Sequence, residues 1–222
     1  MNKTMTKVLG AAAIVAVPVF VHAAGINDPL GDFLPTFAGS SSSTDLDVLS
    51  ATVIYDSSKD LFELTATLDG APGTTPQGVY VWGVNRGAGV ASFAANGIDG
   101  VRFDRVILVS PTGPSSIPGV GTLPTGSVVV SGDTITAFVS GSMLTSTGFQ
   151  HADYTFNLWP RDLAFASAGF GAIADFGPDN ASFTSSPGTV TMPVPEPGSY
   201  ALMLAGLGAV GWAVRRRLPK QR

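Results

Sequence analysis

The sequence predicts an all-β fold, an antiparallel β-sandwich of the jelly-roll-like or immunoglobulin-like kind, in residues 24–192. At least seven short runs of apolar and β-branched residues are separated by turns rich in Gly, Pro, Asp and Ser. Several of these runs alternate apolar and polar residues, which is typical of a half-buried strand. No long stretch of this region keeps the period of about 3.6 residues that an amphipathic helix requires.

Two strands joined by a turn open the predicted fold. The run 48–55 contains only apolar, small or β-branched residues, and the turn after it reads Asp-Ser-Ser-Lys-Asp. In the run 62–68, apolar and polar residues alternate, so one face is expected to be buried. The further predicted strands are 79–84, 101–109, 128–130, 134–139 and 154–158, with a weak last strand within 164–176.

Proline and glycine predict where the chain turns. Residues 111–126 hold four prolines and four glycines, which predicts a long loop. The dipeptide Gly132-Asp133 between two strand runs predicts a tight hairpin. Pro160 has no backbone N–H and is predicted to end the strand that precedes it.

The N-terminus has the pattern of a secretory signal peptide over residues 1–23. Lys3 and Lys7 accompany an apolar run, and no acidic residue is present. The small side chains of Ala23 and Ala24 fit a signal-peptidase site, so cleavage is expected after Ala23. An uncleaved membrane anchor is the alternative, but the apolar run is short for a span.

Charge is distributed unevenly along the chain. Of the 12 Lys and Arg residues, seven lie in the predicted terminal signals, whereas 15 of the 16 acidic residues lie within 24–192. The domain therefore carries a net charge of about −10, which repels nucleic acid and anionic lipid and attracts divalent cations. The absence of cysteine excludes disulfides and thiolate metal ligands.

Acidic residues near the start of the domain predict a calcium site. Asp28 and Asp32 lie in a loop rich in Gly and Pro, whereas Asp45 and Asp47 flank the start of the first strand and share one side of an extended chain. Calcium binds about six to eight oxygen ligands, which such carboxylates and loop carbonyls supply. The spacing matches no EF-hand, and the alternative is that these acids cap turns and face water.

No set of residues predicts catalysis. His151 and Asp153 fall on one side of an extended chain, but no nucleophile motif accompanies them. The chain is therefore expected not to be an enzyme, and a surface hydrolase is the less favoured alternative.

Three aromatic residues suggest a different alternative, a calcium-dependent carbohydrate-binding module. Tyr80, Trp82 and Trp159 would stack on sugar rings in such a module. Each of them lies within an apolar strand, so a place in the core is the competing prediction.

The C-terminal region, residues 193–222, has the order of a membrane anchor. A Pro-Glu-Pro triplet precedes an uncharged run, 198–214, and three arginines follow the run. This run predicts a transmembrane helix of about 25 Å, close to the lower limit for crossing a bilayer. The arginines predict a cytoplasmic end, which leaves the domain on the periplasmic side of the inner membrane.

The tail resembles the PEP-CTERM sorting signal of exported proteins in Gram-negative bacteria. The residues that carry this resemblance are Pro195, Glu196, Pro197, Arg215, Arg216 and Arg217. The resemblance implies that an exosortase-type membrane enzyme cleaves near the triplet, so that the anchor is transient. It also implies localisation at the cell surface or outside the cell, in association with exopolysaccharide and biofilm. With the signal peptide, it predicts an exported and sorted surface protein.

Overall fold

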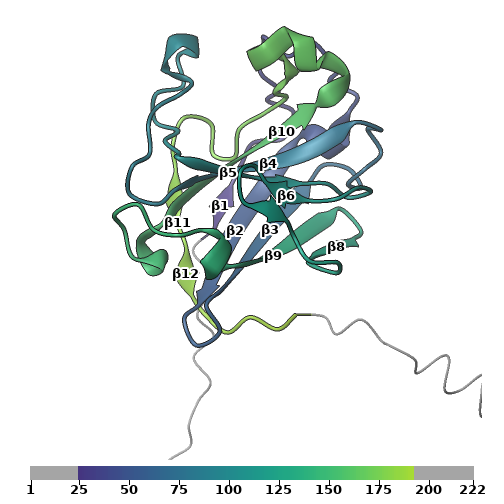
Figure 1. The fold of residues 1–222 in the computed structure, drawn as a ribbon. Helices are drawn as coiled ribbons and strands as arrows, with labels where there is room; N and C mark the ends of the chain where they lie inside the picture. The colour runs from purple at the N-terminus through teal and green to yellow at the C-terminus, as the bar shows by residue number, and fades with distance from the viewer. Residues whose placement is uncertain (1–24, 193–222) are drawn as a thin grey trace, which may run out of the picture.

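A computed structural model describes residues 25–192, which form two β-sheets packed face to face (Figure 1). The first sheet has the strand order β1-β2-β3-β9-β8, and β12 pairs with β2 on the same side as β1. All pairs in this sheet are antiparallel except β2–β12. Its strands are β1 (Ile26–Asn27), β2 (Val48–Asp56), β3 (Leu61–Leu68), β8 (Val128–Ser131), β9 (Thr134–Ser140) and β12 (Ser186–Pro187).

The second sheet is antiparallel throughout and has the order β11-β10-β4-β5-β6-β7. Its strands are β4 (Gly78–Asn85), β5 (Arg105–Val109), β6 (Ser116–Ile117), β7 (Gly121–Thr122), β10 (Thr155–Asp162) and β11 (Phe183–Thr184). The helical segments of the described residues are 3₁₀ helices: η1 (Thr44–Leu46), η2 (Ala94–Asn96), η3 (Gly141–Met143), η4 (His151–Asp153) and η5 (Leu163–Ala172). The predicted β-rich fold with antiparallel sheets is confirmed.

The two predicted terminal signals lie outside the described residues. The signal peptide, 1–23, and the sorting region with its helix 198–214 therefore stay predictions as structural elements. Within residues 25–192, no helix has the length and apolar character that crossing a membrane requires.

The predicted hairpin is present as β2 and β3. Its register pairs Val53 with Leu64 and Ile54 with Glu63, and a β-bulge interrupts the pairing near Val48. The alternate apolar side chains of β3 are all fully buried, and the polar ones between them are half-buried. The alternation in the sequence therefore identifies the buried face of this strand.

One core lies between the two sheets, and a second covers the outer face of the second sheet. The inner core combines Leu64 of the first sheet with Trp82 and Phe156 of the second. The outer cluster contains Val81 and Trp159, against which side chains near η2 and η5 pack. β4 and β10 are therefore buried on both faces. This explains the nearly continuous apolar sequence of β4, whereas β10 also buries the polar side chains of Asn157 and Asp162.

The prediction that Pro160 ends its strand is wrong, because β10 runs two residues beyond it. Successive residues of a strand direct their backbone polar groups to opposite sides. Leu158 N–H donates to the Gly177 carbonyl at 3.0 Å, and the Pro160 carbonyl accepts from Ala174 N–H at 3.0 Å. Pro160 therefore faces the segment 173–177, and its missing N–H leaves the hydrogen bonds between β10 and β4 intact.

The weak strand predicted within 164–176 is also wrong, because most of it forms η5. The Asp162 side chain accepts from Ala164 N–H at 2.9 Å at the start of this helix. Gly169, with φ +60°, lies in the left-handed region that favours glycine and interrupts the helix. The strand predicted over 101–109 begins later, at Arg105, in β5.

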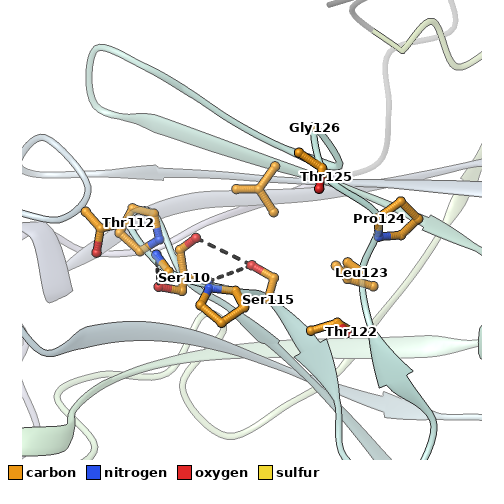
Figure 2. A pocket seen from close by; sticks show the side chains of 12 residues that line it. Ser110, Thr112, Ser115, Thr122, Leu123, Pro124, Thr125 and Gly126 are labelled. Carbon is orange, nitrogen blue, oxygen red and sulfur yellow. Dashed lines mark hydrogen bonds between the residues drawn. The ribbon is translucent and has the colours of Figure 1, made fainter.

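The region 111–126 is more regular than predicted, because β6 and β7 extend the second sheet beyond β5. A hollow of about 480 Å³ opens between residues 110–115 and 122–128 (Figure 2). Ser115 Oγ accepts from Ser110 N–H at 3.0 Å and stabilises one side of it. Hydroxyl, proline and glycine residues make up most of the lining, which contains no charged side chain.

The end of the domain is fastened to the β2–β3 turn. Val190, three residues after β12, is fully buried. Its N–H donates to Asp56 Oδ2 at 3.0 Å, and its carbonyl accepts from Lys59 Nζ. Asp56 Oδ1 accepts from the hydroxyl and the N–H of Ser58. The Ser58 hydroxyl, and then Val190 N–H, hold the pKa of Asp56 well below its usual range.

We expect Asp56→Asn to loosen this attachment, because an amide oxygen accepts hydrogen bonds more weakly than a carboxylate. Amide exchange at residues 186–190 should become faster, and the melting temperature should fall by a few degrees. Asp133→Asn is the matched control, since Asp133 is exposed in the β8–β9 turn.

Strong acid should bring wild type and Asp56→Asn together, but the difference between them should persist at mildly acidic pH. The pKa of Asp56 is lower in the folded protein than in the unfolded chain. Its contribution to the stability of the folded state is therefore complete above the ordinary carboxyl pKa of about 3.9, and it is lost as the pH falls through the folded value. Wild-type residues 186–190 should therefore stay protected at about pH 4. Equal exchange in wild type and Asp56→Asn at that pH would contradict this role of Asp56.

Candidate metal centre

The leading segment, residues 25–34, is hydrogen-bonded to distant parts of the chain. Asp28 N–H donates to the Leu49 carbonyl in β2 at 2.9 Å, and Leu34 N–H donates to the Ala174 carbonyl at 2.8 Å. The segment is thereby held between β2 and a stretch of chain that comes about 140 residues later.

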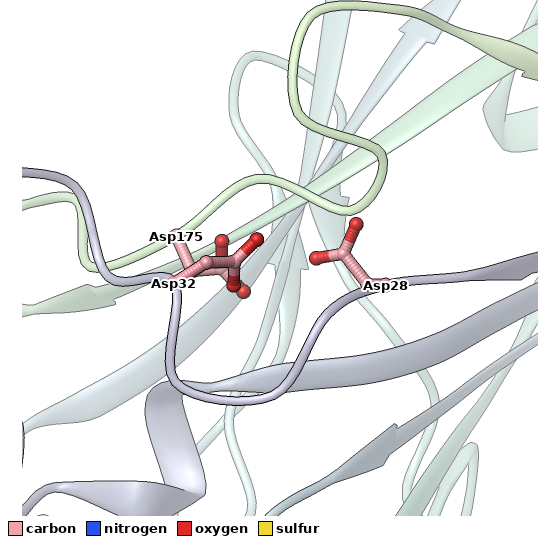
Figure 3. A group of neighbouring side chains, drawn as sticks. All are labelled: Asp28, Asp32 and Asp175. Carbon is pink, nitrogen blue, oxygen red and sulfur yellow. The ribbon is translucent and has the colours of Figure 1, made fainter.

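Three aspartates meet where these segments run together (Figure 3). They are Asp28 and Asp32 of the leading segment and Asp175 of the segment 173–177, and one oxygen of each lies within 4.8 Å of the others. Asp175 is fully buried, and its oxygens accept from Val48 N–H at 2.9 Å and Phe176 N–H at 2.6 Å. Asp28 and Asp32 are half-buried.

A fourth carboxylate, that of Asp47, belongs to the same neighbourhood. Asp47 is 1% exposed, and its Oδ2 accepts from Gly31 N–H in the leading segment at 2.8 Å. Its Oδ1 is buried and has no hydrogen-bond partner among the described residues, and the same holds for Asp28 Oδ2 and Asp32 Oδ1. Three buried carboxylate oxygens are therefore available to a ligand.

Burial and mutual repulsion make this group unfavourable when all of its members are ionised. Burial, followed by the charges of Asp175 and Asp32, raises the pKa of Asp28 to about 8. Burial is also the main reason that the pKa of Asp175 rises to about 7. The pKa values of Asp32 and Asp47 are raised too, first by burial and then by neighbouring acids. A bound cation offsets this repulsion.

Asp45, which the sequence groups with these residues, is held elsewhere. It is fully buried, and its carboxylate accepts from Thr75 N–H at 2.9 Å, the Thr75 hydroxyl at 2.5 Å and the Tyr80 hydroxyl at 3.4 Å. An extended chain would place Asp45 and Asp47 on one side, but η1 turns the backbone between them. Asp45 therefore connects the start of β2 to β4.

Asp175 is the member of the group that the sequence does not reveal by spacing. It lies in the run Ala172–Phe176, in which all the remaining residues are apolar. A single acid in a buried apolar run signals a specific partner, because an unpaired buried charge is costly. That signal identifies a residue of interest but does not identify its neighbours.

The three candidate sugar-stacking residues lie in the two cores. Tyr80 and Trp82 are 0% and 1% exposed in the inner core, and Trp159 is 2% exposed in the outer cluster. Trp159 packs against Phe93 and Phe103, with ring centroids 5.2 and 4.9 Å away. None of the three rings presents a face at the surface for a sugar.

His151 pairs with Asp60 and not with Asp153, which is exposed. Its Nδ1 lies 2.7 Å from Asp60 Oδ1, and the Tyr55 hydroxyl donates to that oxygen at 2.9 Å. Tyr55 and His151 line an open hollow of about 350 Å³. The sequence does not predict this group, because Asp60 and His151 are 91 residues apart.

Comparison with known proteins identifies the tail. A family model described as the PEP-CTERM protein-sorting motif matches residues 193–217, immediately after the described domain. No curated protein and no solved structure matches the chain. The predicted resemblance is confirmed, and the motif implies export, sorting to the cell surface and processing by an exosortase.

We expect Asp45→Asn to lower the free energy of unfolding by about 1–3 kcal/mol, because the amide cannot satisfy the donors of Thr75 and Tyr80 equally well. Urea unfolding of the variant measures this loss. If Asp45 is structural, any stabilisation by calcium should be the same in the variant as in wild type. A selective loss of that stabilisation would instead place Asp45 at the metal centre.

Proposed function

We propose, for a chain whose residues 193–217 match the PEP-CTERM sorting motif, that it is an exported, non-enzymatic protein of the cell surface or extracellular matrix. The observation that carries this proposal is the position of the motif. It begins three residues after Val190, the residue at which the end of the domain is fastened. A sorting signal placed just beyond a closed domain stays accessible after the domain has folded.

The proposed route has three steps. Signal peptidase removes residues 1–23, and the uncharged run 198–214 then holds the chain in the inner membrane. An exosortase-type enzyme cleaves near Pro195–Pro197, after which the domain reaches its destination. The net charge of about −10 on the domain supports this route, because repulsion from anionic lipid disfavours lasting contact with the membrane surface.

In the hollow at His151, the serine hydroxyl of Ser146 supports a role without catalysis. The contact of His151 Nδ1 with Asp60 and its 3.2 Å distance from the Tyr55 hydroxyl do not decide the question, because an aspartate also holds the catalytic histidine of a hydrolase by Nδ1. Ser146, which lines the same hollow, donates its hydroxyl to the Phe149 carbonyl at 2.5 Å. That hydroxyl therefore stabilises its own loop. A surface hydrolase remains the rival function, and an activity screen of wild type against His151→Ala and Asp60→Asn distinguishes the two.

Contact with exopolysaccharide is a second candidate function, and the hollow between residues 110–115 and 122–128 favours it. Its lining is uncharged and includes the hydroxyl groups of several Ser and Thr residues (Figure 2). Such a surface suits a neutral polysaccharide, whose hydroxyls exchange hydrogen bonds with it. This candidate does not depend on Tyr80, Trp82 or Trp159.

Replacing both prolines of the triplet, Pro195→Ala with Pro197→Ala, should block sorting. We expect the variant to accumulate in the membrane fraction, with peptides from 200–214 still attached to the domain. Mass spectrometry of membrane and surface fractions measures this. Pro124→Ala, in a loop of the domain, is the control and should be sorted normally. Wild-type surface protein that retains 200–214 would contradict the proposed processing.

Thr125→Tyr tests the second candidate, because a large side chain at the exposed Thr125 would fill the hollow. We expect wild type to sediment with purified neutral exopolysaccharide and the variant to remain in solution. Val130→Tyr, on an exposed position of β8, is the control and should bind like wild type. Failure of wild type to bind would rule out this function without affecting the sorting proposal.

A further inference from the structure

We infer that Asp28, Asp32 and Asp175, with Asp47 beside them, form a calcium site that fastens the leading segment to the body of the domain. The inference goes beyond the proposed function and does not depend on it. All four residues lie within the described domain, and none belongs to the sorting motif.

Uncompensated negative charge is the first support. The ion pairs found within residues 25–192 lie elsewhere, at Lys59–Asp56, Arg86–Asp104 and His151–Asp60. The four carboxylates therefore share a neighbourhood without a cationic side chain from the described chain. A buried carboxylate without a partner is costly, so a group of them requires protons or a cation.

The carboxylate of Asp47 is the second and independent support. This residue is almost fully buried, yet its Oδ1 has no hydrogen-bond donor among the described residues. Its Oδ2 is fixed by Gly31 N–H, in the loop between Asp28 and Asp32. Asp47 thus lies beside the three clustered acids with one oxygen unused, and a buried polar atom of this kind is rare in a native protein unless a ligand satisfies it.

The donor set fits calcium better than other biological cations. Every side-chain donor is a carboxylate oxygen, and calcium prefers about six to eight such hard ligands in flexible geometry. Zinc sites are built mainly from Cys and His, whereas this chain has no cysteine and its only described histidine pairs with Asp60. Magnesium requires a stricter octahedron and retains several waters, which four crowded carboxylates disfavour.

A cation here would connect three separate parts of the chain. Asp28 and Asp32 belong to the leading segment, Asp47 immediately precedes β2, and Asp175 follows η5. The oxygens of Asp175 accept one backbone N–H each and retain lone pairs for a metal. Calcium would therefore add to the apolar packing of Ile26, Phe33 and Leu34 and to the backbone hydrogen bonds that hold the N-terminal edge of the domain.

The test compares melting temperatures of the full-length chain in mild detergent, with about 1 mM calcium chloride or with EDTA at equal ionic strength. Calcium at about 100 times its dissociation constant should raise the wild-type melting temperature by roughly 5–10 °C. Asp28→Asn, Asp32→Asn and Asp175→Asn should each remove most of this rise. Asp153→Asn, at an exposed acid outside the cluster, should retain it.

The order of the melting temperatures of wild type and Asp28→Asn should reverse between EDTA and calcium, which distinguishes a metal ligand from a carboxylate with only a structural role. In EDTA, Asp28→Asn should melt no lower than wild type, because a neutral amide adds no negative charge beside the carboxylates of Asp32 and Asp175. In calcium, the same variant should melt lower than wild type. Amide exchange of residues 25–34 should slow on calcium addition in wild type only.

Two outcomes would overturn the inference. One is a wild-type melting temperature that calcium does not change, and the other is a calcium-induced rise that survives in both Asp28→Asn and Asp32→Asn. Equal stabilisation by the same concentration of magnesium would overturn the assignment to calcium. If the weakening of two backbone hydrogen bonds prevents Asp175→Asn from folding, Asp28→Asn and Asp32→Asn alone decide between these outcomes.

Discussion

The pairing of β4 with β10 in the middle of the second sheet is the constraint on which the rest of the structure depends. Eight residue pairs join these strands, and both of their faces carry buried apolar side chains. The first sheet covers one face, side chains near η2 and η5 pack on the other, and the segment 173–177 lies beside β10 at the edge of the sheet. That segment is hydrogen-bonded to Leu158 and Pro160 of β10, and it carries Asp175 to the leading segment. The candidate metal centre therefore lies between this edge of the second sheet and β2 of the first sheet.

Strands could be predicted wherever the local pattern and the tertiary environment agree. β3 alternates because one of its faces meets the core, so its sequence is sufficient. Pro160 illustrates the opposite case, since the effect of a missing N–H depends on which side of the strand has a partner. The composition of η5, rich in Ala, Gly and Phe, suits a buried strand equally well. Only the capping by Asp162 and the left-handed Gly169 distinguish the helix, and neither is recognisable without the backbone.

The residues of the candidate site also fall into those that the local sequence reveals and those that only the tertiary structure reveals. Asp28, Asp32 and Asp47 could be found because they cluster within a short stretch of an acidic domain. Asp175 could not, because only the packing of distant segments brings it to them. Asp45 belongs to the same site only if the chain is extended, and a single turn of 3₁₀ helix makes that assumption invalid. For the three large aromatic residues, composition fits a binding platform and a core equally well, and burial alone distinguishes them.

The attachment of Val190 to Asp56 and Lys59 limits how far from the fold the sorting triplet can lie. Pro195 comes five positions after Val190, and even a fully extended chain of that length reaches only about 18 Å. An enzyme that cuts near the triplet must therefore work with the β2–β3 turn close to its surface. If the catalytic centre lay deeper than about 18 Å below the enzyme's surface, the β2–β3 turn would have to enter the enzyme's cleft. The attachment of Val190 to Asp56 thus determines how close the folded domain must come to the processing enzyme. It thereby restricts the shape of an enzyme that can process this chain.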